Sequence, residues 1–427
     1  MKTTISAIFL ILFCLNINAQ TFKAGAAMRD ITPDHLIPIS GGMGTPEIPT
    51  AFLGKLTVRA FVLEKGNTRV AIVSVDNIGW PAYLGDKSRK LIKGIAPENI
   101  LIGATHAHSC PDAYGFTDEN GNTGADLNYL SWCVTQIADA VNDAVSKLEP
   151  ASLKTAVDKA AERIAYNYYA PQLYDRRMGV IQAIATSGKN AGKPIATLVN
   201  YATHPEILGP DRKLLSPDLC GPLYDRIESK VGGMAIFMNS AQGGMVTADT
   251  RIDPQVDGGK ENNDWNECIR IGNLMADEAL RIVESAPVLD NPDIYCASKT
   301  ITFPIESEAM RFVFKHSPLA KDAAKDSDFS SVSTRLNLLN IGKAQIVTVP
   351  GEALPNIGFY VKRKMKSDQP MLFGLTNDAF GYMLTKEDFG GFERYNYVSR
   401  TSLGEMTGTI FEEEAIKFIN ESPVPEK

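Results

Sequence analysis

Histidine is scarce in this sequence, and three of its five copies occur where they could act together. His106 and His108 are separated by one residue, and His204 closes a different apolar segment. In an extended chain, residues i and i+2 point to the same side, so the first two rings are expected to face one cleft. Three neutral imidazoles at such positions would hold a zinc ion with an open coordination position. The alternative is surface or hydrogen-bonded histidines, but their grouping favours the metal site.

Two further side chains are weaker candidates for the same site. Glu352 follows a Pro-Gly pair, and the glycine lets the backbone turn sharply. Its carboxylate would complete the metal shell or act as a base, although a glutamate after such a turn is more often solvated. Tyr382 closes a segment that begins at Asn377. Tyrosine is an uncommon metal ligand, and a single tyrosine is more often packed.

These candidates follow short apolar runs that have the length and composition of buried strands. The runs that end in polar or ionisable residues are 69–75, 100–105, 195–203, 234–238, 345–349 and 371–375. Between them, apolar residues recur with a helical period over 127–148 and 264–286, and shorter helices are expected at 217–231 and 412–418. This alternation predicts an α/β fold with a mixed, largely buried sheet flanked by helices. The active site is expected at the C-terminal ends of the strands.

Composition and charge exclude several classes of protein. The sequence is 44% hydrophobic and 22% charged, which is typical of a globular protein. Its net charge of −7 argues against nucleic acid as a partner. No stretch after the first residues is long and apolar enough to predict a transmembrane segment. The cysteines beyond residue 19 show no CxxC spacing and are expected to be isolated buried thiols, although an oxidising compartment would permit one disulfide.

The N-terminal segment predicts export. Residues 1–19 contain a lysine at position 2, an apolar run and a small residue at the end, as in a secretory signal peptide. The protein is therefore expected to be periplasmic or secreted after cleavage. Because no repeat or Pro/Ser-rich linker divides the rest, residues 20–427 are expected to form a single catalytic domain.

Five segments, in this order, resemble the catalytic domain of the neutral/alkaline (non-lysosomal) ceramidase family. The resemblance extends over about residues 21–415, and its two histidine segments are the most specific. The five segments are AGAAMRDITP at 24–33, GATHAHS at 103–109, NYATH at 200–204, VPGE at 349–352 and LTNDAFGY at 375–382.

The resemblance implies a zinc ion held by His106, His204, Glu352 and Tyr382, with a water between the metal and the substrate. His108 would then act beside the metal, as a proton donor or as a partner of the developing oxyanion. Zinc lowers the pKa of its water and polarises the scissile carbonyl. Cleavage of an amide also needs a proton for the leaving amine.

The sequence departs from the family pattern in three places. A gapless match puts Val246 where the family has a proposed catalytic serine, and a shift of one residue offers the hydroxyl of Thr247 instead. The arginine that binds substrate in the family has no counterpart in 165–168. The chain also stops where longer members continue into an immunoglobulin-like domain. These differences leave all the expected metal ligands in place. They argue against a serine nucleophile, and they do not support the usual substrate of the family.

The loop 242–249 that contains Thr247 also has two consecutive glycines, Gly243 and Gly244. They indicate either a close backbone approach to substrate or metal, with N–H groups that stabilise an oxyanion, or a tight turn without a chemical role. Thr247 is retained as a catalytic candidate, because a hydroxyl beside the metal would orient the attacking water.

The sequence thus predicts an exported zinc-dependent amidohydrolase that cleaves an N-acyl bond in a lipid or small-molecule substrate. One alternative is a zinc hydrolase on the same scaffold that acts on another ester or amide, such as an acylated glycan or glycolipid. A second alternative is a non-catalytic binding homologue, against which the retained His106, His108, His204 and Glu352 argue.

Overall fold

The computed structural model describes residues 21–42, 46–117, 122–255, 260–319 and 328–426. The expected signal peptide at 1–19 lies outside these residues. Within them, the secondary structure follows the predicted alternation of buried strands and amphipathic helices, and the α/β fold class is confirmed.

Eight strands form a large mixed sheet. The parallel pairs lie at its two ends, β11 with β9 and β4 with β5, and the intervening neighbours are antiparallel. In spatial order the strands are β11 (Met234–Asn239), β9 (Pro194–Tyr201), β8 (Arg177–Ala185), β6 (Glu149–Lys159), β1 (Lys23–Asp30), β3 (Thr57–Lys65), β4 (Thr68–Val75) and β5 (Ile100–Ala104).

A smaller sheet packs on one face of the large one. Its strands are, in order, β13 (Ile294–Pro304), β14 (Ser331–Ile341), β15 (Ala344–Thr348) and β17 (Gln369–Phe373), and only β15 and β17 run parallel. Apolar side chains from the two sheets interdigitate in one buried cluster that includes Phe61 and Leu198 on one side and Ile346 and Phe373 on the other. Such burial is the main stabilising term in folding.

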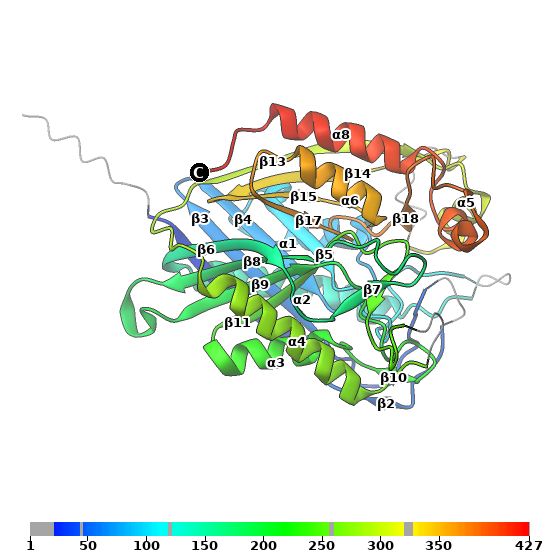
Figure 1. Ribbon diagram of the computed structural model, residues 1–427, viewed down its shortest axis with the longest axis horizontal. Helices are drawn as coiled ribbons and strands as arrows, with labels where there is room; N and C mark the ends of the chain where they lie inside the picture. Colours follow the sequence, from blue (N-terminus) through cyan, green and yellow to red (C-terminus); the bar gives the residue numbers. More distant parts are fainter. Residues whose placement is uncertain (1–20, 43–45, 118–121, 256–259, 320–327, 427) are drawn as a thin grey trace, which may run out of the picture.

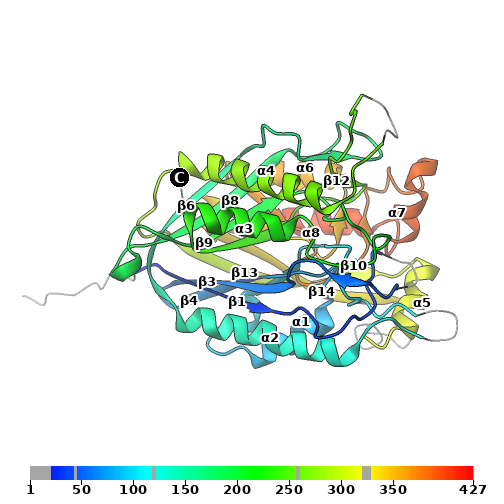
Figure 2. The same cartoon turned by 90° about the horizontal axis from the view of Figure 1, so that it is seen from below.

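Helices cover the two outer faces of this pair of sheets. On the free face of the large sheet, α1 (Ala82–Leu91) and α2 (Leu127–Ser146) cover one half, and α3 (Cys220–Val231) and α4 (Trp265–Glu284) cover the other (Figure 2). The small sheet is covered by α6 (Pro355–Lys364) and α8 (Thr407–Glu421) (Figure 1). The chain therefore forms four layers, in the order helix, sheet, sheet, helix.

The two long helices begin where the sequence supplies a capping side chain. Asp126 accepts hydrogen bonds from the first backbone N–H groups of α2, and Asp264 does the same for α4. These caps satisfy donors that a helix leaves unpaired at its N-terminus. The five cysteines in the described residues are free, and four are buried, as expected from the sequence.

Short elements complete one end of the molecule, where loops connect the layers. Three pairs of short strands lie there, together with α5 (Glu308–His316) and α7 (Asn396–Arg400) (Figures 1 and 2). The pairs are β2 (Ala51–Phe52) with β10 (Leu214–Leu215), β7 (Ala165–Asn167) with β12 (Val246–Ala248), and β16 (Glu352–Ala353) with β18 (Tyr382–Met383). No helix within the described residues has the length and apolar character needed to cross a membrane.

Candidate metal centre

The C-terminal ends of strands from both sheets meet at one place. Backbone hydrogen bonds join Ala104 to Leu375 (3.1 Å) and Gly374 to Asn239 (3.0 Å), which connects the ends of β5, β17 and β11. Polar side chains that follow these strands are therefore brought together from distant parts of the sequence. This is the arrangement that the sequence pattern predicts.

His106 follows β5 and lies in a strained part of the backbone. Its φ of 72° is in the left-handed region, which a residue with a β-carbon adopts at some cost. The backbone N–H donates to Asn77 O at 2.8 Å, and the ring Nδ1 lies 2.5 Å from Ile78 O. The extended conformation expected for this segment is therefore wrong, because the chain turns at His106. The ring centroids of His106 and His108 are nonetheless 4.7 Å apart.

His204, beyond the end of β9, is held by a single carbonyl. Val246 O on β12 accepts from the His204 backbone N–H at 2.8 Å and lies 2.7 Å from the ring Nδ1. The ring centroid is 4.8 Å from that of His106 and 5.5 Å from that of His108. In both His106 and His204 the Nδ1 atom is thus occupied by a carbonyl, which leaves Nε2 available as a ligand atom.

Glu352 on β16 faces these two Nε2 atoms. Its Oε2 lies 3.3 Å from His106 Nε2 and 3.1 Å from His204 Nε2. Burial alone would raise the pKa of the Glu352 carboxyl, but the two imidazoles hold it well below its usual range. The carboxylate is therefore charged. For His204, burial is outweighed by the carboxylates of Glu206 and Glu352, which raise its pKa to about 9.

His108 completes the cluster. Burial lowers its pKa to about 3, so the ring is neutral. Its Nδ1 lies 3.4 Å from Glu206 Oε2, and its Nε2 is buried without a hydrogen-bond partner. The ligand atoms of His106, His108 and His204 lie within 4.8 Å of one another, close enough to share a metal ion.

Tyr382 lies directly beside the carboxylate. It pairs with Glu352 in the parallel register of β16 and β18, so the two side chains emerge from neighbouring positions. The phenol is buried, and its hydroxyl is 3.1 Å from Met245 Sδ. Burial raises the pKa of Tyr382 well above its ordinary value. The structure therefore brings Tyr382 to the cluster, with its hydroxyl in contact with a thioether.

The structure explains why the loop 242–249 contains glycine at positions 243 and 244. Gly243 N–H donates to Ala353 O at 3.0 Å, and a β-carbon at Gly243 would lie 2.4 Å from Glu352 O. Gly244 has a φ of 67°. The close approach is therefore to the strand that carries Glu352, and the Gly243 N–H is not free to stabilise an oxyanion. For Gly243, these contacts agree with a tight turn without a chemical role and not with an N–H group that stabilises an oxyanion.

Thr247 lies on β12 next to His204, with which it forms a parallel bridge. Its side chain lies near the Glu206 carboxylate and helps to lower the pKa of that group. The side chain does not line the cavity described below. The structure thus places Thr247 behind Glu206 and not at the open face of the histidine cluster.

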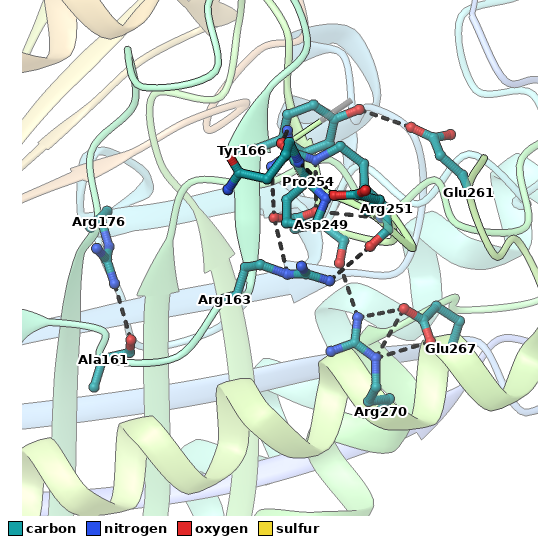
Figure 3. Close-up of polar contacts among 12 residues, drawn as sticks. Ala161, Arg163, Tyr166, Arg176, Asp249, Arg251, Pro254, Glu261, Glu267 and Arg270 are labelled. Carbon is teal, nitrogen blue, oxygen red and sulfur yellow. Dashed lines mark hydrogen bonds and ion pairs between the residues drawn. The ribbon is translucent and has the colours of Figure 1, made fainter. Parts of the chain in front are cut away.

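A network of ion pairs fixes the chain just after β12 (Figure 3). The buried carboxylate of Asp249 accepts from both Nε and Nη2 of Arg251 at 2.9 Å and lies 3.3 Å from Arg163 Nε. Arg251 stacks over the Tyr166 ring at 3.8 Å, and the Tyr166 hydroxyl donates to Glu261. Because β12 carries Val246 and Thr247, this network stabilises the strand that holds His204.

A cavity of about 540 Å³ opens at the cluster. His106, His108, Glu206, Glu352 and Tyr382 line its polar part. Apolar side chains from α5 and the loops around it line another part: Phe116, Met310, Val313, Phe314, Leu319 and Phe380. Asp211, Arg212 and Asn263 also lie in the lining. A concave, mostly apolar site with a few convergent polar groups is the usual form of a small-molecule site.

The sequence-predicted residues therefore converge, apart from the hydroxyl of Thr247. Glu206 is the main residue that the sequence analysis missed. An acidic residue two positions after a strand-end histidine is a signal for it, but a weak one, because the intervening Pro205 makes its direction unpredictable.

Comparison with solved structures identifies the fold. A crystal structure of neutral ceramidase from Pseudomonas aeruginosa matches with a TM-score of 0.76 and 15% sequence identity, covering 96% of this chain and 76% of that chain. A ceramidase complexed with C2 matches with a TM-score of 0.75 and 16% identity, covering 96% and 77%. No family model matches the sequence. No curated protein matches it either. The chain thus has the neutral ceramidase fold.

Proposed function

We propose that the chain is a zinc-dependent amidohydrolase of the ceramidase kind that cleaves an N-acyl bond. The observation that carries this proposal is the buried cluster of His106, His204 and Glu352 at the base of a partly apolar cavity, on a fold shared with ceramidases. Export to the periplasm or the exterior remains a prediction of residues 1–19.

The residues fit a zinc ion. His106 Nε2 is buried and makes no well-aligned hydrogen bond, although the Glu352 carboxylate lies 3.3 Å away, so the atom is available to a further group. Two imidazoles whose other nitrogens are occupied by carbonyls, with a charged carboxylate between them, form a donor set that zinc prefers. We assign His106, His204, Glu352 and the adjacent Tyr382 as the residues that hold it. The chemistry that zinc supplies in such a site is Lewis acidity toward a water and a carbonyl group.

The protein's own side chains supply the remaining requirements. The neutral ring of His108 has a buried and unpartnered Nε2, which suits it to take a proton from the attacking water and return it to the leaving amine. The apolar lining, including Phe314 and Phe380, suits an acyl chain. Burial of the cluster limits the access of bulk water and strengthens its electrostatic interactions.

A second candidate substrate is an acylated glycan or glycolipid. It is favoured by Asp211, Arg212 and Asn263, which add hydrogen-bonding groups to the cavity. Such groups suit a hydroxylated amine or alcohol half better than a second alkyl chain. The reaction class, hydrolysis of an acyl bond, is the same for both candidates.

The proposal is tested with purified protein whose metal content has been measured. The protein is incubated separately with an N-acylsphingosine, an N-acylated amino sugar and an O-acylated sugar. Release of the free acid from each compound is followed. We expect release from at least one N-acyl compound, with loss after zinc chelation and recovery after zinc is restored. Release from the O-acyl compound alone would replace the amidase by an esterase, and no release from any of them would contradict the proposal.

A further inference from the structure

A second carboxylate faces the histidine cluster. Glu206 lies in the loop after β9 and lines the cavity, with 24% of its side chain exposed. Its Oε2 is 3.4 Å from His108 Nδ1. Within the described part of the chain, no lysine or arginine forms an ion pair with it. The carboxylate interacts with the imidazoles of both His108 and His204, which hold its pKa below the usual range although burial alone would raise it.

The contact determines which nitrogen of His108 faces the site. A neutral imidazole carries one proton, and a carboxylate at Nδ1 favours the tautomer with the proton on that atom. The unprotonated atom is then Nε2, which is buried and has no other hydrogen-bond partner. The ring is perpendicular to that of His106, with an interplanar angle of 87°. Nε2 is therefore an available acceptor beside the candidate metal ligands.

The backbone around Glu206 is fixed relative to His108. The His108 N–H donates to Pro205 O at 3.0 Å, and Ser109 Oγ donates to Gly209 O at 3.0 Å. The buried carboxylate of Asp218 accepts from Leu208 N–H at 2.8 Å. The first two hydrogen bonds tie the chain before and after Glu206 to the segment that contains His108, and the third ties the following loop to Asp218. Since the loop is tied on both sides of Glu206, its carboxylate is preorganised toward the ring.

Thr247 adds a second contact to the same carboxylate. Its side chain helps to lower the pKa of the Glu206 carboxyl, and Thr247 itself is held beside His204 by a strand bridge. The order of contacts is therefore Thr247, Glu206, His108 and then the cavity.

We propose that Glu206 is a positioning residue that acts through His108, holding its ring as the tautomer that presents an unprotonated Nε2 to the substrate. The inference rests on the proposed amide hydrolysis. When the water oxygen bonds to the carbonyl carbon, one water proton passes to Nε2. When the carbon–nitrogen bond breaks, that proton passes to the leaving amine. Glu206 stabilises the positively charged ring between these two steps, as the carboxylate of a catalytic triad does.

Steady-state kinetics of variants test this role. Loss of an outer partner of a site residue typically costs about 10–100-fold, so Glu206→Ala is expected to lower kcat by this factor, with KM within about twofold and full zinc content. Glu206→Gln removes the negative charge, and its amide NH₂ can donate to Nδ1 and favour the opposite tautomer, so this variant should not recover the loss. In a His108→Gln background, Glu206→Ala should have no further effect. The exposed Glu421→Gln at the end of α8 is the matched control.

The kinetic outcomes that overturn the proposal are specific. Activity of Glu206→Ala equal to that of Glu421→Gln would show that the carboxylate has no role. A further loss in the His108→Gln background would show that Glu206 acts by another route, and loss of zinc in Glu206→Ala would make it a support of the metal site.

Nitrogen NMR of ¹⁵N-histidine protein provides a readout that does not require turnover. The sequence has five histidines, so the ring signals are few, and His108→Gln assigns the signal of interest. We expect the Nδ1–H tautomer for His108 in the zinc-loaded wild type, and loss of this preference in both Glu206→Ala and Glu206→Gln. An Nε2–H tautomer in the wild type, or no change in Glu206→Ala, would overturn the proposal. If no amide is hydrolysed but the tautomer responds as expected, the proposed function fails and the positioning by Glu206 stands.

Discussion

Glu352 and Tyr382 are thirty residues apart in the sequence, yet they occupy paired positions in two parallel strands of two residues each, β16 and β18. The pairing places a charged carboxylate and a phenol next to each other at the base of the cavity. No local sequence pattern specifies this register. It arises because β15 and β17, which precede the two strands, are themselves parallel neighbours in the small sheet.

This relationship predicts a role of the phenol in metal affinity. Tyr382→Phe is expected to retain the fold, because the ring stays packed, and to bind zinc about 10–100-fold more weakly. Competition with a chromogenic chelator measures the affinity, and Tyr397→Phe in the same cavity is a matched comparison. Zinc affinity equal to that of the wild type would remove Tyr382 from the ligand set.

His108→Ala separates proton transfer from metal binding. With His106, His204 and Glu352 intact, the variant should keep most of its zinc, while turnover falls by about 10²–10⁴-fold because proton transfer is lost. Metal content and kcat are measured on the same sample. Complete loss of zinc would instead make His108 a ligand, an arrangement that the close grouping of the three rings permits.

Thr247→Val tests the hydroxyl that the sequence offered as a catalytic candidate. In the structure it lies near Glu206 and does not line the cavity, so we expect a loss of about tenfold or less, equivalent to about 1.4 kcal/mol of barrier. A loss as large as that of a metal-ligand variant, with zinc retained, or an acyl group trapped on Thr247, would indicate covalent catalysis.

Asp249→Ala tests the network that fixes β12. The carboxylate is 1% exposed and pairs with Arg251 and Arg163, so its removal leaves unpaired donors in a buried position. Because Arg163 is partly exposed, we expect a loss of about 1–3 kcal/mol in the free energy of unfolding. Urea denaturation measures it, with the exposed Asp290→Ala as control. Equal stability of the two variants would show that the network does not hold the strand.

The sequence predicts strands whose apolar run is continuous, whereas the buried strands β3 (Thr57–Lys65) and β8 (Arg177–Ala185) are missed because Arg59 and Gln182 interrupt their apolar runs. Continuous apolar runs predict β4, β5, β9, β11, β15 and β17, and the helical period predicts α2, α3 and α4. By contrast, β13 and β14 were not predicted: β13 is largely half-buried, so its apolar pattern is weak. Helix α5 was also missed, because its nine residues have only two buried side chains.

The same reasoning explains which site residues were found. His106, His204 and Glu352 follow buried strands, and strand ends converge in any such fold. The conformation at His106 was predicted wrongly, because its left-handed backbone depends on a contact with Asn77 on another strand end. Glu206 was missed because it lies in the loop after β9, whose path depends on distant contacts such as that of Leu208 N–H with Asp218.

His204 is the proposed zinc ligand that is fully buried, and we propose that activity depends on the zinc it holds. The most direct test of this proposal is to measure zinc content by elemental analysis and hydrolysis of an N-acyl substrate on the same preparation of His204→Ala, beside the wild type. We predict about one zinc per chain and turnover in the wild type, and loss of both in the variant with the fold retained by circular dichroism. Full zinc occupancy in folded His204→Ala protein would contradict the account.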